Sequence, residues 1–420
     1  MTMGGSDSTI YFSFRPTKGG FADQLQELAI FYRLGRSLGY QYVHRPLRTA
    51  RSTKPHGIAA RITRRAFWPL RALGARVAPE TFFDVYEFLG VNEYLAKAHS
   101  APRSHRPWRI EVFLSDGVLR EHGVSTFDGL RRHVSNVVET SPHHGRSDLL
   151  VEFSLRRDVQ WFALVLQPGS DDARLDLRTA YALTRRDRPL RSMFASDALR
   201  ILVHVRQGDT ALIETPWGSY VSVWGRVSNW MTERRSIDEI DTNRIIRESD
   251  YYAILERLHA VLGNGPISSL VFSDGYDRAF RILRDGMRKR RIAWTSEQVA
   301  AVENQVLDYE HECFRSFRSL DSCTAVVGET RDHLCNLIES LMQCRIVIVG
   351  TQGEMIQKLI ATYFDPDTMP IVIVLFRGTR PEYRTIDLRG MEERFIYVDV
   401  ASMDPERVVA QVRAALDRRA

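Results

Sequence analysis

The residues best suited to chemistry stand at positions 201–210, where an apolar run ends in a polar loop. The run reads Ile-Leu-Val-His-Val and continues as Arg-Gln-Gly-Asp-Thr, which predicts a buried strand followed by a tight turn. Because alternate side chains of a strand share a face, His204 and Arg206 should point the same way. A guanidinium at the carboxyl end of such a strand lies where open α/β sheets bind ligands, and it can hold phosphate oxygens in pairs. We therefore expect Arg206 to bind a diphosphate; the structural alternative is an ion pair with Asp209.

A second loop that could hold phosphate follows the apolar run 345–349. The loop, 350–353, reads Gly-Thr-Gln-Gly and precedes a helical pattern over 354–363. Thr351 and Glu354 have the spacing of a capping box, in which both would only satisfy the helix end. The same helix end also presents backbone N–H groups and a favourable dipole to an anion. The loop is therefore a candidate for holding phosphate through its backbone.

Three acids near such loops could bind a nucleoside or move a proton. Asp274 ends an apolar run, where it would either contact a nucleoside or cap the following helix. Glu214 comes ten residues after His204, and Asp23 follows a glycine-rich loop near the N-terminus. Either Glu214 or Asp23 could take a proton from a hydroxyl group as a general base, and Asp23 could equally cap a helix. Glu214 is our first choice.

The elements around these residues alternate between strands and helices. The N-terminal patterns predict a strand, a glycine-rich loop, a helix and a strand, at 10–14, 16–20, 21–38 and 40–43. From position 199 the patterns predict strands at 201–205, 269–272, 345–349, 371–376 and 394–398, and helices at 250–262, 276–289, 331–343, 354–363 and 404–418. A long connection is expected between 289 and 331. This alternation implies an α/β protein with mostly parallel sheets that helices cover on both faces.

The chain is long enough for two domains. It has 420 residues, of which 44% are hydrophobic and 26% charged, as in ordinary globular proteins. The polar, proline-bearing stretch 185–191 is the best candidate for a linker. We therefore place a first domain at 1–195 and a second at 196–420.

Charge and cysteine content narrow the classes of partner and compartment. The net charge is only +6 and no basic helix carries interleaved aromatic residues, so no nucleic-acid partner is expected. The arginine-rich segment 61–75 is either a solvated insertion, which we favour, or a peripheral contact with an anionic membrane. The four cysteines match no zinc pattern and are expected to be free, buried thiols in a reducing compartment. Without a secretory signal or a bilayer-spanning apolar run, we expect a cytoplasmic protein, at most peripheral to the inner membrane face.

Two further groups of residues are ambiguous. His143 and His144 stand side by side, but no third ligand has a metal-binding spacing, so we interpret them as loop residues. Three tryptophans lie just beyond Glu214 in a stretch expected to be irregular. Each could offer an aromatic platform to a sugar ring or belong to the core. They are Trp217, Trp224 and Trp230.

Four stretches of the chain stand in a characteristic order. They are Gly-Gly-Phe-Ala-Asp-Gln at 19–24, His-Val-Arg-Gln-Gly-Asp at 204–209, Phe-Ser-Asp at 272–274, and Leu-Met-Gln-Cys-Arg at 341–345 with the loop at 350–353. Their order, spacing and element type resemble the GDP-fucose-dependent fucosyltransferase superfamily, which includes bacterial α1,2, nodulation and core α1,6, and protein O-fucosyltransferases. The resemblance implies the GT-B fold, two Rossmann-like domains that face each other across a cleft. It also implies inverting transfer from GDP-fucose to a glycan or other hydroxyl acceptor, without metal or cofactor.

The resemblance also suggests roles for individual residues. Arg206 would bind the donor pyrophosphate and stabilise it as the leaving group, and His204 would contact the diphosphate or position Arg206. Glu214 stands where the α1,6 enzymes carry a glutamate thought to serve as base, and Asp23 is the alternative base. The remaining donor-binding candidates are Gly20, Phe21, Gly208, Asp209, Asp274, Thr351, Gln352 and Gly353.

The sequence departs from the superfamily pattern in three places. Asp23 replaces an asparagine, Gly275 replaces the second acid of Ser-Asp-Asp, and Gln352 with Gly353 replaces serines. Backbone contacts from the loop survive these changes, whereas the hydroxyl groups of the replaced serines are missing. Two other interpretations therefore stay open. One is the same fold with another nucleotide-sugar as donor, and the other is a non-catalytic protein that binds a nucleotide or sugar.

Overall fold

The chain divides into two compact units in the computed structural model. The N-terminal unit comprises residues 1–189 with 358–364 and 383–387, and the C-terminal unit comprises 190–357, 365–382 and 388–420. The main break therefore falls after Pro189, and two later segments group with the first unit. The structure describes residues 9–16, 21–47, 85–99, 107–146, 148–155, 164–165, 175, 177–185, 192–207, 211–223, 233–236, 246–262, 265–288, 293–328, 331–378, 380, 386, 388 and 390–418.

The N-terminal unit is built on four parallel strands in the order β2-β1-β4-β3. Its first elements confirm the predicted strand, helix and strand, while residues 17–20 of the predicted loop lie outside the described residues. The strands are β1 (Ile10–Phe14), β2 (Gln41–Tyr42), β3 (Trp108–Leu114) and β4 (Leu149–Leu155). The helices are α1 (Phe21–Ser37), α3 (Val85–Phe88), α4 (Val91–Ala98), α5 (Asp116–Glu121), α6 (Phe127–Glu139) and α8 (Arg178–Arg185).

Aromatic side chains form the centre of this unit. Phe31 of α1 stacks on Phe14 of β1 and on Phe153 of β4, with ring centroids 5.3 and 5.4 Å apart. A Cβ at Gly35 would lie 2.5 Å from the ring of Phe12, so only glycine lets α1 approach β1 this closely. The apolar face of α1 thus anchors the helix that follows the glycine-rich loop.

The C-terminal unit is built on six parallel strands in the order β10-β9-β5-β11-β12-β13. Numbered along the chain, this order is 3-2-1-4-5-6, the Rossmann arrangement, and it reverses between β5 and β11. Together the two parallel sheets confirm the predicted α/β class with two Rossmann-like units. The strands are β5 (Leu199–Val205), β9 (Ile267–Ser273), β10 (Cys323–Val327), β11 (Ile346–Gly350), β12 (Ile371–Phe376) and β13 (Phe395–Asp399).

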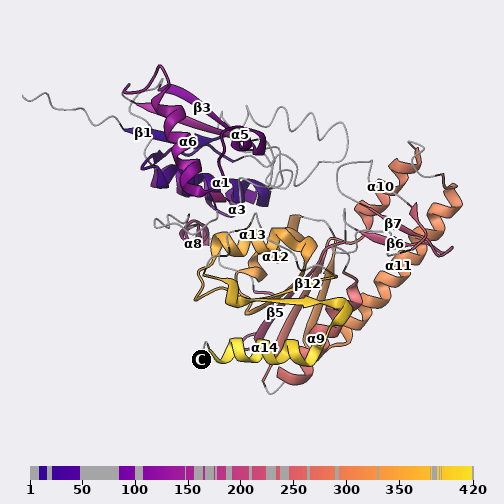
Figure 1. The fold of residues 1–420 in the computed structure, drawn as a ribbon. Helices are drawn as coiled ribbons and strands as arrows, with labels where there is room; N and C mark the ends of the chain where they lie inside the picture. Colours follow the sequence, from indigo (N-terminus) through magenta and orange to yellow (C-terminus); the bar gives the residue numbers. More distant parts are fainter. Residues whose placement is uncertain are drawn as a thin grey trace, which may run out of the picture. The chain divides into compact units, whose positions relative to one another are not determined.

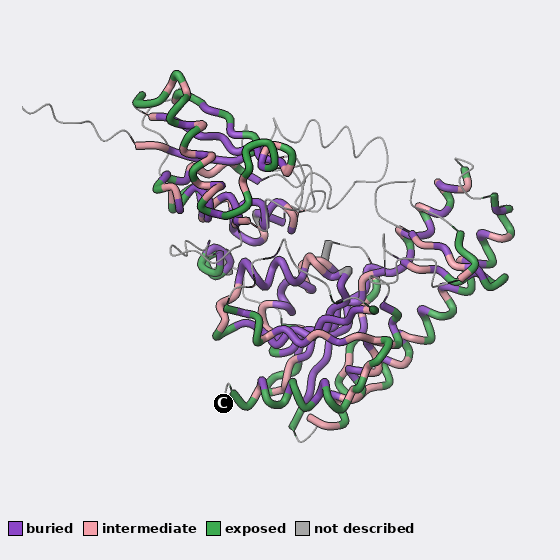
Figure 2. The backbone as a smooth tube through the Cα atoms, viewed as in Figure 1, coloured by how far each residue is buried: buried purple, intermediate pink, exposed green. Residues whose placement is uncertain are grey.

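Helices cover both faces of this sheet (Figure 1). On one face α9 and α14 pack against the strands together with the C-terminal end of α11, and α12 and α13 lie on the other. The central strands are buried over most of their length, which explains the apolar runs within them (Figure 2). The helices are α9 (Glu248–Leu262), α10 (Asp277–Arg288), α11 (Ser296–Ser319), α12 (Arg331–Leu341), α13 (Glu354–Tyr363) and α14 (Pro405–Asp417).

The predicted long connection between 289 and 331 is wrong, because it contains α11 and β10. A capping box in which Thr295 and Gln298 exchange hydrogen bonds begins α11. Buried side chains then recur at helical spacing over 24 residues. The expectation of buried cysteines also needs correction: all four are free, but only Cys344 is fully buried.

A small antiparallel sheet replaces the irregular stretch predicted after Arg206. Its buried side chains pack on α10 and the first half of α11. Trp217 at the first turn is 41% exposed and donates its Nε1–H to Glu233 at 2.7 Å, while Trp224 and Trp230 lie outside the described residues. The strands are β6 (Leu212–Glu214), β7 (Tyr220–Ser222) and β8 (Glu233–Arg234).

The remaining predictions concern the histidine pair, metal ions and the membrane. His143 and His144 lie in the turn after α6, as predicted for loop residues. Within the described ranges, no cluster of three or more His, Cys, Asp and Glu side chains could hold a metal ion, and no helix is long and apolar enough to cross a bilayer. The segment 61–75 lies outside the described residues.

Candidate functional site

Three neighbouring strands of the C-terminal unit end in polar residues at one edge of the sheet. β5 lies between β9 and β11 and is parallel to both, so their carboxyl ends meet. Arg206 follows β5, Asp274 follows β9 and Thr351 follows β11. The edge includes the switch point between β5 and β11, where α/β sheets of this kind bind ligands. The structure therefore brings these three predicted residues together.

Asp274 ties the ends of β5 and β9 to each other. One of its oxygens accepts the backbone N–H of Gln207 at 2.7 Å, and the other lies 3.6 Å from the Arg206 guanidinium. The predicted helix-cap role is wrong, because α10 begins three residues later, at Asp277. The alternative partner of Arg206, Asp209, lies outside the described residues, as does Gly208. About a quarter of the Arg206 side chain is exposed, so the guanidinium can meet a ligand.

His204 lies beneath the loop that follows β11. Only 3% of it is exposed, and a Cβ at Gly353 would lie 3.6 Å from its Nδ1. Burial, with the charges of Arg206 and His333, lowers the pKa of His204 to about 3. The imidazole is therefore neutral at physiological pH and offers a hydrogen bond rather than a positive charge. Its place under the loop favours the positioning role over direct charge pairing with a diphosphate.

The loop after β11 is helical from its first residue. A 3₁₀ turn over Thr351–Gly353 runs directly into α13, and Gly350 takes the N-cap position with extended backbone and no side-chain cap. The predicted capping box is therefore wrong, since Thr351 lies inside the helical run. The first N–H groups of such a run have no partner within it, which makes this end of α13 suited to an anion.

Gly350 is required by the packing around this turn. A Cβ there would collide with the hydroxyl oxygen of Tyr251 on α9 and lie 3.2 Å from Cγ1 of Ile246. Only glycine lets β11 and its helical turn come so close to the start of α9. The turn at 351–353 is thereby fixed against the residues that precede α9.

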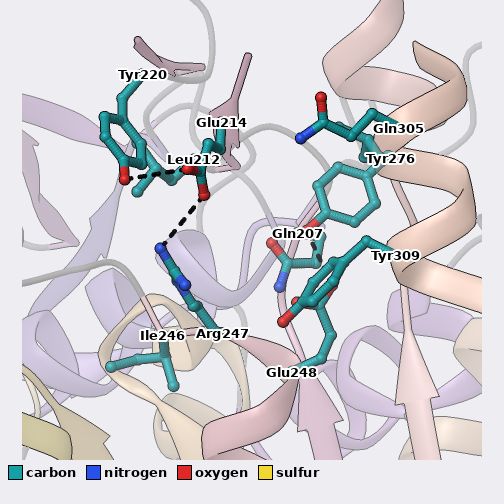
Figure 3. Close-up of a pocket in the computed structure, with 11 residues that line it drawn as sticks. Gln207, Leu212, Glu214, Tyr220, Ile246, Arg247, Glu248, Tyr276, Gln305 and Tyr309 are labelled. Carbon is teal, nitrogen blue, oxygen red and sulfur yellow. Dashed lines mark hydrogen bonds and ion pairs between the residues drawn. The ribbon is translucent and has the colours of Figure 1, made fainter. Parts of the chain in front are cut away.

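A pocket of about 120 Å³ opens beside Gln207 (Figure 3). Its walls come from the end of β5, the β6–β7 hairpin, the start of α9, the start of α10 and the middle of α11. In Figure 3 the Glu214–Arg247 pair lies on one side, and Tyr276, Gln305 and Tyr309 lie on the other. The lining residues are Gln207, Leu212, Glu214, Tyr220, Ile246, Arg247, Glu248, Tyr276, Gln305, Val306 and Tyr309.

Glu214 is the predicted base that reaches this pocket. It ends β6, and about half of its side chain is exposed. Its carboxylate accepts a hydrogen bond from the Tyr220 hydroxyl at 3.3 Å and lies 3.8 Å from the guanidinium of Arg247. The carboxylate is thus oriented by two groups while remaining accessible from the pocket.

Glu248 is a second acid of the pocket that sequence reasoning missed. It is the first residue of α9, is 1% exposed, and accepts a hydrogen bond from the Tyr276 hydroxyl at 2.9 Å. Burial raises the pKa of Glu248 to about 7. An acid in the first turn of a helix usually lies in solvent, where it interacts favourably with the helix dipole. The local sequence therefore did not indicate that Glu248 is buried. Glu310 of α11 is another buried acid nearby, and burial raises its pKa to about 7 as well.

The remaining predicted residues belong to the N-terminal unit. Phe21 begins α1, and its carbonyl accepts a weak hydrogen bond from Tyr86 at 3.3 Å. Asp23 pairs at 2.8 Å with the buried ammonium of Lys358, which groups with the same unit. Gly20 lies outside the described residues. Lys358 therefore neutralises the charge of Asp23 within the N-terminal unit.

The N-terminal unit carries a charged cluster that the sequence did not indicate. Glu152 of β4 is buried and pairs with Arg15, just after β1, at 2.5 Å and with Arg45, which follows β2. Burial alone would raise the pKa of Glu152, but the two arginines outweigh it and lower the pKa. The cluster ties three strands together at the carboxyl ends of the first sheet.

No known protein family matches the sequence, and no curated protein matches it. Among solved structures, the chain is similar to an α,α-trehalose-phosphate synthase (UDP-forming) from Burkholderia vietnamiensis, with 13% identity, 97% of this chain and 91% of that chain covered, and a TM-score of 0.28. It is also similar to a glycosyltransferase from Rickettsia africae ESF-5, with 10% identity, 98% of this chain and 89% of that chain covered, and a TM-score of 0.25. The fold assignment rests on the strand orders rather than on these likenesses.

Proposed function

We propose that the protein is a glycosyltransferase that moves a sugar from a nucleotide-sugar to a hydroxyl acceptor with inversion. The proposal rests on one observation. Arg206 follows β5, and the helical turn Thr351–Gly353 follows the neighbouring strand β11, at the switch point of the Rossmann sheet. A partly exposed guanidinium and a helix N-terminus on adjacent strands both favour a diphosphate. A diphosphate is the part that all nucleoside diphosphate sugars share.

Arg206 stabilises the leaving group in this proposal. Negative charge grows on the diphosphate as the glycosidic bond breaks, and a fixed cation opposes that charge without reorganisation. Asp274 pairs with the guanidinium at 3.6 Å. The dipole of α13 adds positive potential at the same edge. The buried, neutral His204 positions the turn from below.

Glu214 takes the proton of the acceptor hydroxyl. Its carboxylate reaches the pocket, and Tyr220 and Arg247 restrain it. In the inverting reaction the acceptor oxygen attacks the anomeric carbon on the face opposite the diphosphate. The diphosphate leaves with the bonding electron pair, and the acceptor proton passes to Glu214. Asp23 remains the alternative base, although Lys358 neutralises its charge in the N-terminal unit.

We propose GDP-fucose as the donor and a glycan as the acceptor, on the resemblance of the motifs to the fucosyltransferases. In those relatives positive charge comes from arginine and backbone rather than from a metal, and we propose the same here, with no cofactor. The resemblance also implies that the acceptor enters a cleft between two domains. That cleft stays a prediction.

A second candidate is the same reaction with a different nucleotide. Gly275 stands where the relatives carry a second acid, and its φ of +64° is a conformation that side chains rarely adopt. A Cβ there would lie only 3.0 Å from Val327. This chain therefore lacks the acid that flanks the nucleoside in the fucosyltransferases, and the packing around position 275 disfavours a side chain there. This observation favours testing several nucleotides rather than GDP alone.

Calorimetry in the presence of EDTA tests the proposal. GDP, UDP and CMP, each with and without an attached sugar, are titrated into the full chain. Binding of one nucleoside diphosphate supports a transferase and names its donor class. Absence of binding at millimolar ligand would overturn the proposal. NMR coupling constants of the product then decide between inversion and retention at the anomeric carbon.

A further inference from the structure

The pocket beside Gln207 touches both elements that would hold a diphosphate. Gln207 directly follows Arg206, and its side chain forms one wall. Ile246, on another wall, lies 3.2 Å from the position that a Cβ of Gly350 would occupy. A group attached to a diphosphate between Arg206 and the turn at 351–353 is therefore at the entrance to this pocket.

The volume of the pocket limits what it can take. At about 120 Å³ it is well below the size of pockets that enclose drug-sized ligands, which begin at about 300 Å³. It accommodates one ring with its substituents rather than a whole nucleoside. The occupant is therefore either the transferred sugar or the nucleobase alone.

The distribution of polar groups separates these two occupants. Glu214 and Arg247 form one wall, while Glu248 and Gln305 stand on others (Figure 3). A pyranose carries hydroxyl groups around its whole rim, so it needs hydrogen-bond partners on several sides. A nucleobase has two apolar faces and uses few polar edges. Polar groups on facing walls favour the sugar.

The position of the reacting groups points the same way. Inversion places the anomeric carbon between the leaving diphosphate, held by Arg206, and the base. Gln207 and Glu214 both line the pocket. A sugar ring in the pocket would thus lie between the residue that follows Arg206 and the proposed base, as the reaction requires.

We propose that this pocket is the glycosyl subsite, which binds the ring of the donor hexose, and that Glu248 is a specificity-determining residue within it. The inference rests on the proposed function. The Glu248 carboxyl is fixed by the Tyr276 hydroxyl at 2.9 Å and is shielded from water. A buried carboxyl that meets a ligand hydroxyl discriminates strongly, because the wrong sugar leaves it unpaired.

Two variants test this assignment by calorimetry with GDP and GDP-fucose, or with the nucleotide pair that binds if GDP does not. Glu248→Gln keeps the shape of the side chain, and Gln305→Ala changes an exposed position of α11 that folding tolerates. Each should weaken nucleotide-sugar binding about tenfold, the worth of one hydrogen bond, and leave nucleotide binding unchanged. Asn304→Ala is the matched control, since Asn304 is exposed on the same helix and does not line the pocket.

The outcomes separate the inference from the proposed function. Equal loss of nucleotide and nucleotide-sugar affinity would assign the pocket to the nucleobase and overturn the inference alone. Unchanged affinity for both ligands in both variants would also overturn it. A wild-type chain that binds no nucleotide would overturn the proposed function, and the inference with it. If Glu248→Gln does not fold by circular dichroism, Gln305→Ala decides alone.

Discussion

The carboxylate of Glu214 lies 3.8 Å from the guanidinium of Arg247, across one side of the pocket. Glu214 ends a strand of the small antiparallel sheet. Arg247 immediately precedes α9, which packs on the Rossmann-like sheet. The pair therefore connects the inserted hairpin to the main fold at the pocket. Because both side chains are nearly half exposed, the contact is worth little as a source of stability. Its value lies in holding the carboxylate in one orientation.

Replacing Glu214 by glutamine removes the proposed base and keeps the shape of the side chain. We expect nucleotide affinity to stay within about twofold, whereas transfer falls about 10²- to 10⁴-fold, the usual contribution of general base catalysis. Calorimetry and a product assay measure the two quantities. Tyr220→Phe is the matched control, because it removes only the hydrogen bond at 3.3 Å and should lower transfer slightly. Normal transfer by Glu214→Gln would move the role to Asp23, which Asp23→Asn then tests.

Arg206 carries the diphosphate in the proposal, so its removal should act on binding as well as on turnover. Arg206→Ala should weaken nucleotide binding about 10- to 100-fold, the range for hydrogen bonds to a charged group. Arg206→Lys keeps the charge without the paired donors and should lose less. Thermal unfolding of each variant checks that the loss of the ion pair between Arg206 and Asp274 has not disturbed the fold. Wild-type affinity in Arg206→Ala would remove the central residue of the proposal.

Gly350→Ala tests the close approach between β11 and α9. The added methyl group meets the Tyr251 hydroxyl, so we expect a loss of about 1–3 kcal/mol in the free energy of unfolding, as for other overpacked sites. Adding Tyr251→Phe removes the oxygen and should restore part of that loss. Gly265→Ala is the control, because a Cβ there meets nothing within 4 Å. Urea denaturation compares the four proteins, and an unaffected Gly350→Ala would contradict the packing argument.

The sequence predicted the sheet edge of the C-terminal unit well, for a physical reason. Strands β5, β9 and β11 are buried on both faces over most of their length, so each contains a short apolar run that is followed by polar residues. Parallel strands place those ends on one edge, and the residues that follow them meet without any long-range information. The order of the strands was not needed to find Arg206, Asp274 and Thr351.

Contacts between distant parts of the chain could not be predicted in this way. Asp23 and Lys358 pair across 335 positions. Glu248 is buried because Tyr276 and α11 fold over it, and its local sequence is that of an ordinary polar first turn. The strands of the small sheet have two or three residues, too few for an alternating pattern. The start of α11, in contrast, could have been predicted from the capping-box spacing of Thr295 and Gln298.

Glu310 makes the stability of the protein depend on pH. Burial, and then the negative charges of Glu248, Asp277 and Asp274, raise its pKa from 4.5 to about 7. The folded state therefore keeps a proton that the unfolded chain releases, and stability falls as pH rises from about 4.5 to about 7. Glu310→Gln cannot ionise. We expect it to be more stable than the wild type at pH 8 by about 1–3 kcal/mol, and equally stable at pH 4.5.

Urea denaturation at the two pH values measures this difference. Comparing the variant with the wild type cancels the titration of groups that the substitution leaves unchanged. Glu312→Gln serves as the control, because it makes the same chemical change at an exposed position of the same helix. Glu310 does not line the pocket, so nucleotide binding should be retained and reports that the fold is intact. A Glu310→Gln variant less stable than the wild type at pH 8 would mean that the carboxylate is stabilised by partners in the folded state, contrary to its burial at 6% exposure.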